Sequence, residues 1–159
     1  MNKETLTTYL NDHHAGSVGA LELVDNLIEV FEGKPLAPFL RDVRAEIDAD
    51  QHTLEQLIKQ IGANESAVKK AGAWVMEKIS RAKFKISEAS EDQIGLFMAL
   101  ESLVLGVTGK RELWTALSAA AESIPELRHM DYARLVTRAQ EQCDRINTKR
   151  LELARKAFL

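Results

Sequence analysis

The segment LAPFLRDVRAEIDADQHTLEQLIKQI (residues 36–61) decides the fold of this chain. Its apolar residues recur in alternating steps of four and three, the spacing of a helix that packs one face into a bundle. The series consists of Leu36, Leu40, Val43, Ile47, Asp50, Leu54, Leu57 and Ile61. Asp50 is its single charged member. Because an unpaired carboxylate is costly to bury, the pattern predicts that Asp50 meets a polar partner on a neighbouring helix.

The same spacing occurs in three other long segments of the chain. We expect long helices over about residues 3–32, 37–61, 90–121 and 131–157, with glycine or proline between the first two. A shorter amphipathic helix over about residues 64–86 should lie in the connection between the second and third long helices. No strand pattern interrupts the series. The sequence therefore predicts an all-α fold in a single domain, residues 1–159.

The lengths of the connections predict how the long helices run. Only a few residues join the first two, and the link over residues 123–130 is also short, so each connection should make an antiparallel pair. The segment over residues 62–90 is long enough to return along the whole bundle. The expected topology is therefore up, down, down, up, with the shorter fifth helix in the long crossover.

Composition favours a globular protein in a reducing compartment. The 159 residues are 45% hydrophobic and 28% charged, and the net charge is −3. We expect no nucleic acid partner because the chain lacks an overall basic balance, and no membrane partner because no signal peptide or membrane span is readable. Cys143 is the single cysteine, which excludes an internal disulfide. These features predict a cytoplasmic protein.

Two stretches, together with the expected topology, resemble bacterial proteins of the ferritin-like superfamily. They are YLNDHHAGSVGALELVDNLIEV (residues 9–30) and LRDVRAEIDADQHTLEQLIKQ (residues 40–60). The resemblance implies a ferritin-like four-helix bundle. In metal-binding members of that class, two helices each supply a Glu and the other two each supply Glu-x-x-His.

This chain departs from that ligand pattern. Ala49 stands three residues before His52, and Asp144 stands three residues after Glu141. At about 100° per residue, His52 and Glu22 should both face away from the seams of their helices and be solvated. The departures disfavour a di-iron centre.

Counting residues from the helix ends places several polar side chains near the height of Asp50. The predicted buried polar layer comprises His13, Ser17, Glu46, Asp50, Arg111 and Gln142. Hydrogen bonds from Arg111 and His13 would compensate the charge of Asp50. About two turns away, Arg150 should meet Glu101 in the same manner. The preferred interpretation is an ion-pair layer that fixes the register of the helices.

The alternative is a metal site in the same layer. Imidazole, carboxylate and thiolate together suit zinc, iron or manganese. The candidate ligands are His13, His14, Glu46, Asp50 and Cys143. A permanent cation at Arg111 would repel a metal ion and compete for the carboxylate. The preferred prediction therefore contains no cofactor and no catalytic residue.

On these grounds the sequence predicts a non-enzymatic structural or interaction protein, with a metal-binding or redox ferritin-like protein as the alternative. The crossover segment, residues 63–86, holds six basic residues against two acidic ones beside Trp74 and Phe84. If these two aromatic side chains are exposed together, a homo-oligomer or a protein partner follows. In the first helix, Gly16 and Gly19 indicate either a close approach to a neighbouring helix near the polar layer, which is the preferred interpretation, or a local distortion of the helix.

Overall fold

A computed structural model describes residues 2–62 and 93–159 of the chain. These residues form four α-helices, namely α1 (Lys3–Val30), α2 (Ala37–Gln60), α4 (Gln93–Ala121) and α5 (Tyr132–Ala157). A short 3-10 helix, η1 (Pro125–Leu127), lies between α4 and α5, and the described ranges contain no strand. The all-α prediction is confirmed for the described residues. The predicted crossover helix over residues 64–86, with Trp74 and Phe84, and the start of the third long helix near residue 90 lie outside the described residues.

Local sequence explains where the helices begin and end. The side chains of Asn2 and Asp131 accept hydrogen bonds from the backbone N–H groups of Thr5 and Arg134, which caps α1 and α5. Gly33 and Gly62, which follow α1 and α2, have φ angles of 73° and 66°. Glycine adopts this left-handed conformation without the steric cost that a Cβ would add, so each glycine permits the chain to turn out of its helix.

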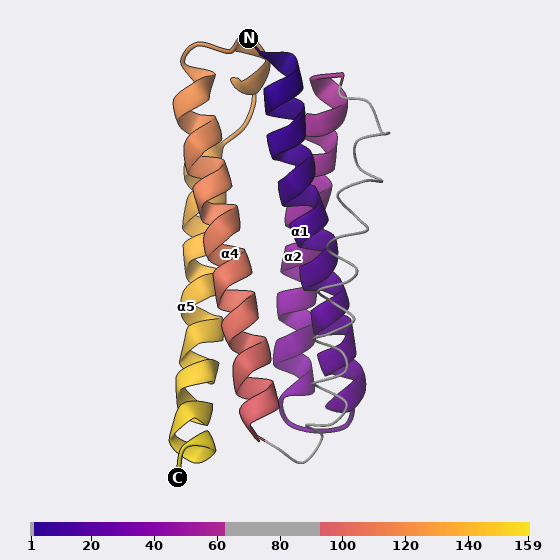
Figure 1. The fold of residues 1–159 in the computed structure, drawn as a ribbon, viewed down its shortest axis with the longest axis vertical. Helices are drawn as coiled ribbons and strands as arrows, with labels where there is room; N and C mark the ends of the chain where they lie inside the picture. Colours follow the sequence, from indigo (N-terminus) through magenta and orange to yellow (C-terminus); the bar gives the residue numbers. More distant parts are fainter. Residues whose placement is uncertain (1, 63–92) are drawn as a thin grey trace.

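Figure 1 shows two helical hairpins side by side. α1 descends from the N-terminus and α2 returns beside it, whereas α4 ascends and α5 descends to the C-terminus. α2 and α4 therefore run in the same direction, and the most extensive packing occurs within each hairpin. None of the helices in residues 2–62 and 93–159 is long and apolar enough to cross a membrane.

The apolar core falls into two clusters along the bundle. The fully buried members of the first cluster include Val24, Leu27, Leu40, Leu100 and Ile146. The buried members of the second cluster include Leu10, Leu54, Leu57, Leu113, Trp114 and Leu127. Along α2 the clusters change between Ile47 and Leu54, and Asp50 lies at this boundary. The charged residue therefore separates two apolar regions that both hold the hairpins together.

Three glycines inside the helices do not mark tight helix contacts. A Cβ added to Gly16, Gly106 or Gly109 would meet no atom within 4 Å. The predicted close helix approach at Gly16 is therefore wrong, because open space adjoins this residue.

Glycine substitutions should have opposite effects in helices and at turns. Gly106→Ala should raise the free energy of unfolding by about 0.5–1 kcal/mol, because alanine loses less backbone entropy and has room at this site. Gly33→Ala should lower it by about 1 kcal/mol because φ is 73° there. Urea unfolding of both variants provides the measurement. A stabilising Gly33→Ala would contradict the assigned turn.

Candidate functional site

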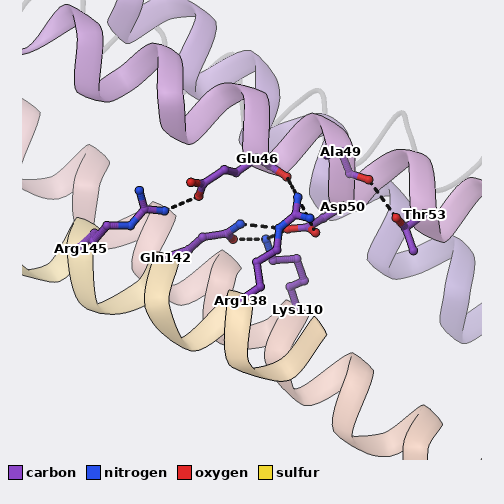
Figure 2. A network of polar contacts seen from close by, with 8 residues as sticks. All are labelled: Glu46, Ala49, Asp50, Thr53, Lys110, Arg138, Gln142 and Arg145. Atoms are coloured by element: carbon purple, nitrogen blue, oxygen red, sulfur yellow. Dashed lines mark hydrogen bonds and ion pairs between the residues drawn. The ribbon is translucent and has the colours of Figure 1, made fainter. Parts of the chain in front are cut away.

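Asp50 is the centre of a buried charged layer that joins α2, α4 and α5. Its side chain is 3% exposed. Lys110 Nζ lies 2.5 Å from Asp50 Oδ2, and Arg138 Nη2 lies 3.1 Å from Asp50 Oδ1. Gln142 Nε2 also donates a hydrogen bond to Asp50 Oδ2, at 3.1 Å. Figure 2 shows these side chains converging on Asp50, with Lys110 reaching it from α4 and the other two from α5.

Gln142 completes a closed set of hydrogen bonds with the ion pair. Its Oε1 accepts from Lys110 Nζ while its Nε2 donates to Asp50. Because the amide uses a donor toward the acid and an acceptor toward the amine, its orientation is determined by the pair. Gln142 is only 1% exposed. Each of the three side chains therefore satisfies part of the hydrogen-bonding requirement of the other two.

A second acidic side chain of α2 extends the layer toward the surface. Arg138 Nη2 also donates to the backbone oxygen of Glu46 at 3.1 Å. The Glu46 carboxylate forms an ion pair with Arg145. Figure 2 shows Glu46 and Asp50 on the side of α2 that faces α5. Two successive turns of α2 are thus tied to α5 through arginine side chains.

The cluster contains three cationic and two acidic side chains, and the carboxylates of Asp42 and Glu141 also lie near Arg145. Asp50 and Glu46 carry two negative charges when ionised, whereas Lys110, Arg138 and Arg145 carry three positive charges. Burial lowers the pKa of Lys110, and the charge and hydrogen bond of Asp50 oppose this effect. The Arg138 charge adds to the lowering. The contacts with Asp50 therefore stabilise the charged form of Lys110 against the cost of burying it.

The predicted Asp50–Arg111 contact is wrong. Arg111 instead pairs with Glu112 at 2.7 Å and donates through Nη1 to Gln140 Oε1 at 2.5 Å. Consecutive residues on a helix diverge by about 100°, so Lys110 faces Asp50 and Arg111 turns away. The prediction identified the height of the cation along the bundle but chose the neighbouring residue.

His13 and Ser17 lie beside the layer without bonding to Asp50. The His13 ring packs edge to face on Tyr9 with 4.8 Å between centroids, and no His13–Asp50 hydrogen bond occurs in the described structure. Ser17 Oγ donates to the backbone oxygen of His14 at 2.6 Å and accepts from Gln51 Nε2 at 2.9 Å. The predicted His13–Asp50 contact is therefore wrong, because the His13 ring packs on Tyr9 instead.

One other predicted ion pair and two predicted exposures can also be compared with the structure. Arg150 Nη1 lies 2.7 Å from Glu101 Oε2, which confirms that predicted pair. His52 is exposed as expected. Glu22 is half buried, so its predicted full solvation is wrong. Asn11, which is buried, lies at about the same angle around the axis of α1 as Glu22 does. This face of the helix is therefore partly covered as well.

The candidate metal ligands are engaged elsewhere. His14 Nε2 lies 2.9 Å from Glu55 Oε1, and Cys143 Sγ lies 3.6 Å from Thr108 Oγ1. Asp50 already has two cationic partners. Within residues 2–62 and 93–159, no group of three or more His, Cys, Asp or Glu side chains has the arrangement needed to hold a metal ion. The described geometry therefore does not assemble the predicted ligand set.

A cavity of about 340 Å³ adjoins the charged layer between α1, α2 and α4. Asp50 and Lys110 contribute to its wall, as do His13 and Ser17. The remaining lining residues are Asp12, Gly16, Ala20, Ile47, Gln51, Leu54, Gly106, Val107, Gly109, Leu113 and Trp114. The site therefore combines a buried charged group with a largely apolar enclosure.

Comparison of the chain with protein-family models, curated proteins and solved structures finds no match.

The partly buried position of His13 predicts a change in stability with pH. Burial lowers its pKa below the usual value of 6.5, an effect that the nearby charge of Asp12 opposes. Between the folded-state pKa and 6.5, the unfolded chain binds more protons at this site, so stability should rise with pH through that interval. Urea unfolding at several pH values should show that His13→Gln removes this part of the rise.

The exposed His129 provides a matched control for that measurement. His129→Gln should retain the rise that His13→Gln removes. An unchanged pH profile in His13→Gln would contradict the proposed effect of burial.

Proposed function

We propose that this protein is a non-enzymatic, ferritin-like helical bundle of the bacterial cytoplasm, in which the Asp50 layer sets the register between two hairpins. Support for the bundle comes from the directions of the four described helices, which agree with an up, down, down, up arrangement. Support for the structural role comes from Asp50, whose charge is compensated by Lys110 and Arg138. Buried polar groups can specify register because a shifted alignment would leave them unpaired.

The compensation of Asp50 is the observation that carries this proposal. A metal ion at the same carboxylate would have to displace Lys110 or Arg138, or bind while both positive charges remain nearby. The proposed role requires no such exchange. As an interaction protein, the bundle would bind a second copy or another protein through exposed apolar side chains such as Met98 and Leu105.

Metal analysis tests the structural role of the layer. We expect protein purified without a chelator or affinity metal to contain much less than one iron, manganese or zinc ion per chain. Adding each metal should leave the thermal midpoint unchanged, because Asp50 already has cationic partners. Stoichiometric metal that is lost in Asp50→Leu would overturn the proposal in favour of a metal-binding function.

A further inference from the structure

We propose that the cavity between α1, α2 and α4 binds a small organic monocation, in which one ammonium group is joined to a compact apolar body. This inference goes beyond the structural role of the charged layer. It rests on the carboxylate of Asp12, on the apolar walls and on the open space beside the helix glycines.

Asp12 supplies the charge that the ligand would meet. Three charged side chains line the cavity, namely Asp12, Asp50 and Lys110, so the lining carries one excess negative charge when all three are ionised. Asp50 and Lys110 pair with one another (Figure 2), and Arg138 reaches Asp50 from α5 without lining the cavity. The described residues give the side chain of Asp12 no ion pair and no hydrogen bond. A ligand cation would therefore be attracted to Asp12, whereas an anion would be repelled.

His13 adds an acceptor beside Asp12 and no opposing charge. Its side chain lines the cavity, and its ring forms no hydrogen bond with the described residues. Burial lowers the pKa of His13 below 6.5, although the charge of Asp12 opposes this effect, so the imidazole is neutral at pH 7. A neutral imidazole has one nitrogen without a proton, which can accept a hydrogen bond from an ammonium group. The two neighbouring residues thus both offer acceptors to a cation.

The body of the ligand would occupy the apolar part of the cavity. This part of the wall consists of Ala20, Ile47, Leu54, Val107, Leu113 and Trp114. A volume of about 340 Å³ lies at the lower end of the range usual for small-molecule sites. Asp12 is exposed, so an ammonium group beside it would stay partly hydrated while the apolar body is buried. The arrangement therefore favours a compact molecule with one charged end.

Helix glycines keep the cavity open beside Asp12. Gly16 of α1 and Gly106 of α4 are exposed and both line the cavity, which places its opening between these helices. Gly16 follows Asp12 by four residues and so lies on the same face of α1. Alanine would fit at either glycine and would favour the helix, yet both positions lack a side chain. The carboxylate therefore lies close to the path by which a ligand would enter.

Nuclear magnetic resonance can test binding at this site. The chain has two tryptophans, so a Trp74→Phe variant identifies the indole N–H signal of Trp114, which lines the cavity. The probes are 2-phenylethylammonium, the uncharged 2-phenylethanol and the anion 3-phenylpropanoate, at a low ionic strength of about 0.01 M, where screening is weak. We expect saturable shifts with 2-phenylethylammonium and a dissociation constant of about 1 mM or below, a range accessible to ligands of this size.

The three probes should differ in affinity according to their charge. Because Asp12 is exposed, its attraction for the cation is modest, and 2-phenylethanol should bind about three- to fivefold more weakly than 2-phenylethylammonium. The anion should bind about tenfold more weakly than the cation, because Asp12 repels it. Raising the ionic strength to about 0.15 M should reduce these differences.

Two substitutions should weaken binding in different ways. Gly109→Leu should fill the cavity without a clash and weaken the binding of 2-phenylethylammonium by about tenfold or more. Asp12→Asn should weaken its binding by about three- to fivefold and leave that of 2-phenylethanol unchanged. The matched controls, Ala116→Leu and Asp48→Asn, change exposed positions outside the cavity lining and should bind as the parent does. Folding of each variant is checked by circular dichroism.

The proposal is overturned if 2-phenylethylammonium does not shift the Trp114 signal, or if its binding survives Gly109→Leu in a folded protein. Equal or tighter binding of the alcohol or the anion would also overturn it, as would an unchanged affinity in Asp12→Asn. These outcomes are distinguishable from failure of the proposed structural role, because that role is judged by metal content and by the stability of Asp50 variants.

Discussion

Replacing Asp50 with leucine should lower the free energy of unfolding by about 3–5 kcal/mol. The substitution removes the carboxylate that compensates Lys110 and Arg138, and it leaves a buried ammonium without its main partner. Gln142 would lose an acceptor at the same time. Urea unfolding followed by circular dichroism measures the loss. The exposed Asp48 is the matched control, and Asp48→Leu should change stability by no more than about 0.5 kcal/mol.

A second substitution at Lys110 should recover much of that loss. The double variant Asp50→Leu with Lys110→Met removes both members of the ion pair and replaces them with apolar side chains of similar length. Arg138 is 33% exposed, so its charge can turn toward water. The effects of the two single substitutions should therefore be strongly non-additive. Additive losses would show that the Asp50–Lys110 contact contributes little to the folded state.

The helices were predictable because their local signals agree. In α2, the alternating apolar series coincides with buried residues, and Asp50 is buried within it as the spacing predicts. In α5, the expected start near Asp131 agrees with the observed cap at that residue. Apolar spacing and capping both depend on residues close together in sequence, so they can be recognised without knowledge of tertiary contacts.

The error at Arg111 arose because α4 contains two apolar series that share residues. Both series include Leu100, Val107 and Trp114, but one continues through Val104 and Arg111. The buried face follows the other series, which comprises Leu96, Leu100, Leu103, Val107, Trp114 and Leu117, with the partly buried Lys110 between Val107 and Trp114. Leucine at positions 103 and 117 was the signal in favour of this second series, since these side chains bury more apolar surface than valine or serine.

Arg138 and the cavity were not predictable from periodicity. Arg138 lies only partly buried, at the edge of α5, and its contact with Asp50 depends on how closely α2 and α5 approach. The cavity likewise depends on the separation of three helices. Glycines in a helix favour either close packing or open space, and the sequence alone does not distinguish these outcomes.

Replacing Trp114 with alanine should lower the free energy of unfolding by about 3–5 kcal/mol. Its side chain is 1% exposed and belongs to the second apolar cluster, so the substitution removes a large buried volume that neighbouring side chains can only partly refill. Thermal and urea unfolding provide the measurement. Leu105→Ala, on the same helix but 68% exposed, is the control and should change stability by no more than about 0.5 kcal/mol.

Trp114→Phe separates loss of volume from loss of the indole N–H. The Nε1 atom is buried, and the described part of the chain supplies no hydrogen-bond partner for it. Leaving such a donor unpaired costs about 1–3 kcal/mol, so removing it should offset part of the lost packing. We therefore expect a much smaller loss in Trp114→Phe than in Trp114→Ala. Equal losses would show that the indole N–H contributes a favourable contact, and the assigned environment of Trp114 would then be wrong.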